Sequence, residues 1–298
     1  MIKRLGINDP LNYEFSRFIK PRLWVESGES IVVETEDALS GQIKTENDRR
    51  DKTKIPWSNP VTGPINVENS EPGDHLAVTI EEINPLDNQC VTRTAPSSHL
   101  MEWLGSDAPH GTHICPIIDD KIFWSEKIII PYKPMVGCIG TALDVGVQNT
   151  NLAGNWGGNM DLIEVCPKNT IFIPVFVKGG FLFLGDIHAA MGHGELSATG
   201  LEMSSSTKIK IKLIKKTNFD GVRIESNKSI MTVASGRPME NSIANAMSHL
   251  IFWMEKDYDW NRWKAYDLLT HVASISIGYF GIGTVAVKIN KSYLTNYL

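Results

Sequence analysis

Short apolar runs separated by turn residues recur through the first 240 residues of the chain. They are rich in β-branched and aromatic residues, and Gly, Pro, Asn or Asp bounds each of them. Such runs predict β-strands, and many short strands between turns are typical of a sandwich or a barrel. The clearest predicted strands are Ser30–Thr35, His75–Ile83, Lys127–Pro131, Thr170–Val177, Gly180–Leu184 and Thr207–Leu213.

Helical periodicity begins only towards the C-terminus. Apolar residues recur at three- and four-residue steps over Met239–Lys256, which predicts an amphipathic helix. A second helix is predicted over Trp260–Ser276, ended by Gly278, and extended structure returns over Gly283–Ile289. The predicted fold class is therefore mainly β, with sandwich- or barrel-like subdomains and a smaller α+β portion towards the C-terminus.

The 298 residues are enough for one to three domains. The Ser- and Asn-rich segment Glu225–Ser229 is the best candidate for a junction. We therefore predict a mainly β catalytic region over residues 1–225, which could consist of two intertwined subdomains, and an α+β region over residues 226–298 that packs on it.

Composition and charge limit the classes of partner that we expect the protein to bind. The formal net charge is -5, and the one basic cluster, Lys208–Lys216, alternates with apolar residues. This alternation places lysines on the solvent face of a strand, so we expect no nucleic acid among the partners. No stretch reaches the roughly 18 apolar residues of a membrane span, and the N-terminus lacks the apolar run of a signal peptide. The prediction is a cytoplasmic protein without a membrane partner.

The four cysteines lie far apart, without the close pairs of a zinc site or the density of a disulfide scaffold. They are expected to be reduced and mostly buried. Cys138 has apolar neighbours and no local base, which predicts an inert core thiol. If the protein binds a metal, we therefore expect its ligands to be Asp, His or Glu rather than Cys.

The segment Gly185–Glu195 is the densest group of glycines and candidate ligands. If the preceding strand continues into it, Asp186 and His188 project on one face by the two-residue period. The small residues that follow allow a tight turn, which would bring Glu195 back to the same point. Two carboxylates and an imidazole can hold a divalent cation with an open position.

An ordinary structural interpretation stands beside this one. Asp after Gly is common in turns, and His188 could be a satisfied histidine at the end of a strand. Against it, Asp186, His188, His193 and Glu195 are four ionisable groups in a segment too small and apolar to solvate them well. A second glycine-rich segment, Gly157–Asp161, is expected to form a loop and adds a carboxylate and an amide. The residues alone leave both interpretations open.

Other polar segments have simpler structural interpretations. Asn59–Ile65 is predicted to be a rigid connector before a strand at Ile65, because its prolines fix φ. Arg49 and Arg50 lie in a mixed-charge run that is typical of a solvated turn. Exposed positions in a loop-like region are predicted for His99, His110 and His113.

From about residue 30 onward, the chain resembles the acetamidase/formamidase family. Four groups of residues carry the resemblance, and they run in the family's order along the chain. They are Asn59–Ile65 leading to Glu71–Asp74, Ile129–Pro131 with Pro134–Gly140, Gly157–Asp161 and Gly185–Glu195.

The resemblance implies a mainly β enzyme that hydrolyses the C–N bond of a short aliphatic amide, such as formamide or acetamide, to ammonia and a carboxylate. It also implies a bound metal: zinc is our first expectation, with calcium or another divalent ion as the alternative. The metal ligands are predicted to be Asp186, His188 and Glu195. The catalytic residues are predicted to be Glu195, Asp161 and His193, and the substrate-binding residues Asn159, Gly157 and Gly158.

In the predicted mechanism the metal activates water, Glu195 moves a proton to the departing nitrogen, and the N–H groups of Gly157 and Gly158 bind the oxyanion. His193 stands where the family usually has Asp, which would shift metal preference towards nitrogen-accepting ions such as zinc. The alternative function is a non-catalytic, metal-stabilised β-sandwich that binds a small ligand. For the enzyme we expect a small amide as partner and a homodimer or higher homo-oligomer.

Overall fold

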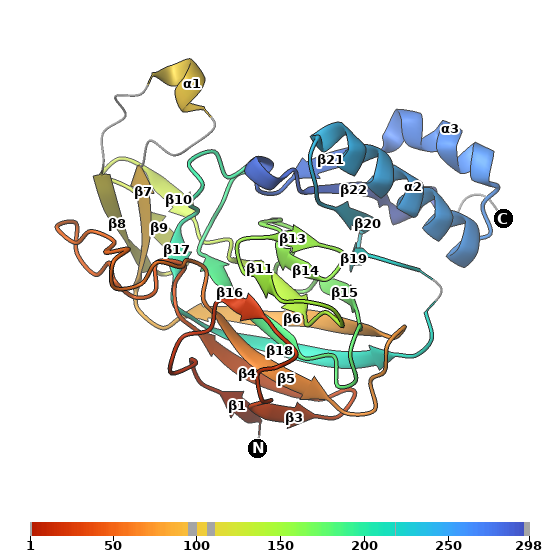
Figure 1. Cartoon of the computed structure of the whole chain (residues 1–298). Coiled ribbons are helices and arrows are strands. Elements are labelled where there is room, and N and C mark those ends of the chain that lie inside the picture. Colours follow the sequence, from red (N-terminus) through yellow and green to blue (C-terminus); the bar gives the residue numbers. More distant parts are fainter. Residues whose placement is uncertain (1, 95–99, 106–110, 218, 295–298) are drawn as a thin grey trace.

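Figure 1 shows a computed structural model of the chain, which describes residues 2–94, 100–105, 111–217 and 219–294. Most of the regular structure is β, arranged in two large sheets, and the longer helices lie together towards the C-terminus. The prediction of a mainly β fold is confirmed. One hydrophobic cluster contains residues of both sheets, including Ile31 and Ile211 from one and Ile139 and Leu184 from the other, so the two sheets share a core.

The first sheet has nine strands in the described part of the chain, and all neighbours pair antiparallel except β1 and β4. Alternation sets its faces: Ile209 and Ile211 are buried, whereas Lys208 and Lys212 on the same strand are not, as predicted. Its spatial order is β1 (Lys3–Leu5), β4 (Ser30–Thr35), β18 (Ser205–Ile214), β6 (His75–Pro85), β15 (Thr170–Pro174), β19 (Val222–Glu225), β20 (Ser229–Ala234), β22 (Val285–Asn290) and β21 (Ser274–Ile277).

The second sheet has eleven strands among the described residues and carries the segments that resemble the family. Nine follow in the order β10 (Ile129–Pro131), β9 (Lys121–Phe123), β8 (Gly111–Ile118), β7 (Gln89–Thr94), β17 (Glu202–Met203), β16 (Leu182–His188), β11 (Met135–Thr141), β14 (Gly157–Asn159) and β13 (Ala153–Gly154). The other two are β5 (Val61–Val67), which pairs with β16, and β3 (Leu23–Val25), which pairs with β5; β2 (Glu14–Phe15) and β12 (Gln148–Asn149) form a separate ribbon.

The predicted helix over Met239–Lys256 is confirmed as α2 (Met239–Asp257). The second prediction is wrong at its end, because α3 (Arg262–Val272) is followed by the strand β21. Residues 274–277 pair with the edge of β22, and this pairing overrides the helical spacing of the sequence. The remaining short elements are α1 (Met101–Leu104) and the 3₁₀ turns η1 (Phe280–Ile282) and η2 (Lys291–Tyr293).

Helices α2 and α3 pack together with β20 and β22 around a second hydrophobic core, which includes Leu250, Trp253 and Val287 (Figure 1). Strands β19 and β20 pair directly across residue 225, so the sheet continues through the predicted domain junction, and the division there stays a prediction. None of the described helices is both long and apolar enough to cross a membrane.

The interpretation of Asn59–Ile65 as a connector is wrong. Strand β5 already begins at Val61, because this segment pairs antiparallel with β16 and parallel with β3. His113 lies on β8 rather than in a loop, and His99 and His110 lie outside the described residues. All four cysteines are free, and Cys138 is fully buried, as expected of a core thiol.

Candidate active site

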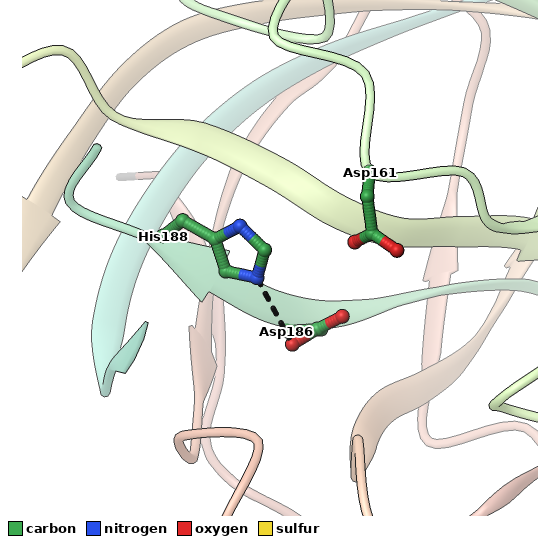
Figure 2. A group of neighbouring side chains, drawn as sticks. All are labelled: Asp161, Asp186 and His188. Atoms are coloured by element: carbon green, nitrogen blue, oxygen red, sulfur yellow. Dashed lines mark hydrogen bonds and ion pairs between the residues drawn. The ribbon is translucent and has the colours of Figure 1, made fainter. Parts of the chain in front are cut away.

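Strand β16 presents Asp186 and His188 to one buried point. The strand lies between β11 and β17, and both side chains are almost completely inaccessible to solvent. Nε2 of His188 lies 3.4 Å from Oδ1 of Asp186, the contact drawn as a dashed line in Figure 2. Asp186 has a φ of 57°, a left-handed conformation that a non-glycine residue adopts only when its surroundings hold it there.

Asp161 reaches the same point from the segment after β14. Its backbone N–H donates to the carbonyl of Gly137 on β11, the strand next to β16, which sets the side chain opposite Asp186 and His188 (Figure 2). Ligand atoms of Asp161, Asp186 and His188 all lie within 4.8 Å of one another. Two sequence motifs about 25 residues apart (161 against 186) are thus joined by strand pairing.

A closed loop after β16 supplies two further carboxylates. The N–H of Ala189 donates to the carbonyl of Leu201, and the N–H of Leu201 donates to that of Ala190, so the chain leaves β16 and returns beside it. This brings back Glu195 and then Glu202, which lies on β17. Ligand atoms of His188, Glu195 and Glu202 also lie within 4.8 Å of one another, as the predicted tight turn requires.

Two asparagines hold the carboxylates in place. Nδ2 of Asn59 donates to Oδ1 of Asn159 over 2.8 Å and to Oδ2 of Asp186 over 3.1 Å. Nδ2 of Asn159 in turn donates to Oδ2 of Asp161 over 2.9 Å. Since Asn59 precedes β5 and Asn159 ends β14, this chain of hydrogen bonds connects three strands around the site.

Burial makes this cluster electrostatically unusual. Desolvation, reinforced by the charges of Glu195 and Asp186, raises the pKa of Asp161 well above its ordinary value. Burial also raises the pKa of Glu195 to about 8 and that of Glu202 to about 7. Burial opposes the charged form of His188, but the carboxylates of Glu202 and Asp186 raise its pKa well above the usual value. Four buried carboxylates around one imidazole need additional positive charge.

The cluster fits a divalent cation. Oδ1 of Asp161 and Oε2 of Glu202 are buried without a hydrogen bond, although Nε2 of His188 lies 3.3 Å from Oε2 of Glu202; such buried oxygens are costly unless something else satisfies them. Glycine keeps the space around them open: a Cβ at Gly137 would lie 2.5 Å from Oδ1 of Asp161, and one at Gly200 would lie 2.5 Å from Nδ1 of His188. One imidazole nitrogen and several carboxylate oxygens form a donor set that zinc and related divalent ions accept.

A polar cavity of about 280 Å³ opens onto this cluster, and we call it the polar cavity. Its walls include Asn59 and Asn159 together with three of the carboxylates, Asp186, Glu195 and Glu202. A small molecule in the polar cavity can therefore reach Glu195, whose raised pKa suits proton transfer near neutral pH.

Three predicted site residues lie elsewhere. His193 is exposed and lines a second, largely apolar cavity of about 550 Å³, which we call the apolar cavity. Gly157 and Gly158 are not in a loop: they form β14, paired with β11 on one side and β13 on the other, and they do not line the polar cavity. The extended pairing on both sides uses the backbone groups that the predicted oxyanion role requires.

Sequence reasoning missed Asn59, Glu202 and Arg50, all of which line the polar cavity. Glu202 carried a usable signal, since it is an acidic residue between Leu201 and Met203 and the only charged residue between Glu195 and Lys208. Asn59 carried none beyond its place before a proline, and Arg50 is hidden in a run of mixed charge.

The model of the acetamidase/formamidase family matches residues 10–144 and 149–276, which is most of the chain and includes all five clustered side chains. The chain belongs to this family. Solved structures share its fold: an acetamidase from Yersinia enterocolitica is 31% identical, with a TM-score of 0.91 over 99% of this chain and 94% of that one. An acetamidase from Bacillus halodurans is 29% identical, with a TM-score of 0.89 over 97% and 98% of the two chains.

Curated relatives are more distant. An acetamidase from Mycolicibacterium smegmatis is 25% identical over 64% of this chain and 63% of its own length. The chain spans between 61% and 63% of the length of the curated relatives that it matches.

Proposed function

We propose that this family member hydrolyses the C–N bond of a small carboxamide to ammonia and a carboxylate in the polar cavity. The observation that carries the proposal is the convergence of Asp161, Asp186, His188, Glu195 and Glu202 on one buried point beside a cavity of small-molecule size. Family membership and the names of the relatives, acetamidase and formamidase, support the same reaction.

Asp161, Asp186, His188 and Glu202 are the residues that would hold a divalent ion, zinc foremost, with calcium as the alternative. When bound, such an ion supplies Lewis-acid polarisation and lowers the pKa of water. A nitrogen ligand favours zinc, whereas calcium prefers an all-oxygen set. This assignment replaces Glu195 of the predicted ligand set by Asp161 and Glu202, because Glu195 is the most exposed of the three carboxylates that line the polar cavity, at 9% against 2% for Asp186 and Glu202.

Glu195 is the proposed proton carrier. Burial raises the pKa of Glu195, and a carboxyl group with a raised pKa can both take up and release a proton during the reaction. As water adds to the carbonyl carbon, the carboxylate of Glu195 accepts its proton; as the C–N bond breaks, the same group returns that proton to the departing nitrogen. Ammonia leaves, and the acyl carbon keeps the oxygen of water as a carboxylic acid, whose proton then passes to ammonia to give a carboxylate and ammonium.

Asn59 and Asn159 are positioning residues in this scheme. Their hydrogen bonds fix the rotamers of Asp186 and Asp161, and so limit the carboxylates to one arrangement. Because both asparagines also line the polar cavity, they contribute polar groups next to the reacting amide.

The test is ammonia release from formamide, acetamide and propionamide by wild-type protein and by the Asp186→Asn and His188→Ala variants. We expect each variant to lose at least about 1000-fold in kcat/KM together with its bound metal. His193→Ala is the matched control, because it removes an exposed imidazole from the same loop.

Folded variants that keep wild-type ammonia release and metal content would refute the proposal. Metal bound without turnover of any amide would instead support the non-catalytic ligand-binding sandwich. Elemental analysis of the same samples identifies the ion, and a zinc content below that of calcium would reverse our choice of metal.

Two further predictions accompany this function. We propose that the protein forms a homodimer or higher homo-oligomer and that it acts in the cytoplasm. Light scattering at several protein concentrations tests the first, and fractionation of the source cells tests the second.

A further inference from the structure

The polar cavity has a second wall of opposite charge. Arg50, from the segment after β4, and Arg93, on β7, both line it, as does the exposed side chain of Lys52. Neighbouring residues on β7 point to different cavities, since Thr92 lines the apolar cavity and Arg93 the polar one. Cations thus face the same space as the carboxylates of the site.

Neither arginine is neutralised by a carboxylate of the fold. Among the described residues, ion pairs within 4.0 Å join Arg223 and Arg262 to carboxylates, but not Arg50 or Arg93. The Nε atoms of both Arg50 and Arg93 are buried without a hydrogen-bond partner. Arg50 donates through Nη2 to the carbonyl of Trp57, a neutral acceptor.

The two guanidinium groups also lie close enough to act on each other. Burial, together with the positive charge of Arg93, lowers the pKa of Arg50. Two like charges with buried, unpaired N–H groups lower the stability of the folded chain. Such an arrangement is typical of a site where a bound ligand offsets this loss of stability.

The carboxylates that line the polar cavity are in contact with other groups. Asp186 accepts a hydrogen bond from Asn59, Oε1 of Glu202 accepts the N–H of Gly200 over 2.8 Å, and both carboxylates lie within 3.4 Å of Nε2 of His188. Neither carboxylate is within ion-pair distance of Arg50 or Arg93, so the polar cavity is lined by separate acidic and basic groups.

We propose that the amide substrate carries its own carboxylate: it is the monoamide of a short dicarboxylic acid, with its anionic end bound by Arg50 and Arg93 and its amide at the acidic cluster. The inference rests on the amide hydrolysis proposed above and names the substrate class of that site. A guanidinium group presents a planar fork of N–H donors that matches a carboxylate, and a buried pair of this kind is strong and selective.

The size of the polar cavity agrees with such a substrate. At about 280 Å³ it has several times the volume of a water molecule, which takes up about 30 Å³ in the liquid, whereas formamide has only about three non-hydrogen atoms. A four-carbon monoamide has about eight non-hydrogen atoms and separates its two polar ends by two methylene groups, so it can reach both walls.

The experiment compares two amides of equal length on the metal-loaded enzyme. Succinamate and butyramide differ by a carboxylate in place of a methyl group, and malonamate and propionamide form a shorter pair. We expect wild-type kcat/KM to favour the anionic member by at least about 100-fold, because a site built for a charged group discriminates strongly against an analogue without it. In Arg93→Gln this ratio is expected to fall to within about 5-fold of unity.

Arg49→Gln is the matched control. It removes the same charge from the residue next to Arg50, but Arg49 is exposed and does not line the polar cavity, so the ratio should stay at the wild-type value. A folded Arg93→Gln protein that keeps the wild-type ratio would overturn the inference. Equal or better hydrolysis of the neutral amides by wild-type enzyme would overturn it as well, while leaving amide hydrolysis itself intact.

Failure of the proposed function has a different signature. If no amide is hydrolysed, the proposed function is wrong. Binding of succinate, measured by calorimetry, then tests whether Arg50 and Arg93 form an anion site. Binding to wild-type protein that weakens at least about 10-fold in Arg93→Gln would support an anion site at Arg50 and Arg93. Absence of succinate binding to wild-type protein would refute it.

Discussion

The polar cavity and the apolar cavity are both lined by residues of the loop after β16, but they differ in size and in the side chains that line them. They share Glu195 and Thr199, yet the apolar cavity is the larger, at about 550 Å³ against about 280 Å³. Side chains such as Trp124, Ile130 and Leu196 line the apolar cavity, whereas asparagines, carboxylates and arginines line the polar one. Size alone would favour the apolar cavity as the reaction site; the buried groups without partners are our reason for proposing the polar cavity instead.

The two cavities also differ in their expected effect on the stability of the fold. The polar cavity concentrates unpaired buried atoms and residues with left-handed backbone, including Asp161, Asp186 and Glu195. Such features persist where function requires them and other contacts stabilise the fold. Variants on the two sides of the loop should therefore have opposite profiles of activity and stability.

The largest difference is expected between two glycines of the same loop. Both glycines line the apolar cavity, but a Cβ at Gly200 would lie 2.5 Å from the imidazole of His188, whereas a Cβ at Gly192 would meet nothing within 4 Å. Gly200→Ala should displace His188 and lower kcat/KM and metal affinity by about 100-fold. Gly192→Ala should stay within about 3-fold of wild type, and equal effects of the two substitutions would show that contact with the acidic cluster does not set this part of the loop apart from the apolar cavity.

The next effect concerns stability and its dependence on pH. Asp37 is buried beside Ala38 and Leu39, which line the polar cavity, and its Oδ1 accepts the N–H groups of Leu39 and Gly41. Burial, with a contribution from the charge of Glu36, raises the pKa of Asp37 to about 6. The unfolded chain therefore loses this proton at lower pH than the folded chain, and stability falls as the pH rises from about 4 to about 6.

Asp37→Asn keeps the acceptor and removes the charge. We expect the variant to be more stable than wild type by about 2 kcal/mol above pH 6 and equally stable below pH 4, as measured by urea unfolding across this range. If the difference in the free energy of unfolding between the two proteins does not change with pH, the negative charge of Asp37 does not destabilise the folded protein. Any destabilisation that accompanies the polar cavity would then come from other residues.

The smallest effect is expected at His193, which the sequence suggested as a catalytic residue. Because His193 is exposed and lines the apolar cavity, His193→Ala should keep ammonia release within about 3-fold of wild type. A loss above about 100-fold with unchanged metal content would bring the apolar cavity into the mechanism.

What the sequence revealed follows from distance along the chain. Asp186, His188 and Glu195 belong to one short segment, so strand alternation and a turn of small residues were enough to predict that they converge. Glu202 and Asn59 join through the closing of a loop and through the pairing of β5 with β16, and no local periodicity encodes such contacts.

The same limit explains the errors. Residues 157–159 are rich in glycine and were expected in a loop, but close packing between β11 and β13 requires glycine: a Cβ at Gly157 would lie 2.2 Å from the carbonyl of Ile139. Arg50 has the sequence context of a solvated turn, and only the fold brings it beside Arg93. The helix predicted over Trp260–Ser276 ends early because its last residues form β21 at the edge of a sheet.

The central claim is that the buried cluster of carboxylates around His188 holds an ion and hydrolyses an amide. The most direct measurement follows metal content and ammonia release together while chelated wild-type protein is reloaded with zinc in steps. We predict that activity rises in proportion to bound metal and levels off at about one ion per chain, and that His188→Ala neither binds the ion nor releases ammonia. Full ammonia release by protein freed of metal, or by His188→Ala, would contradict the account.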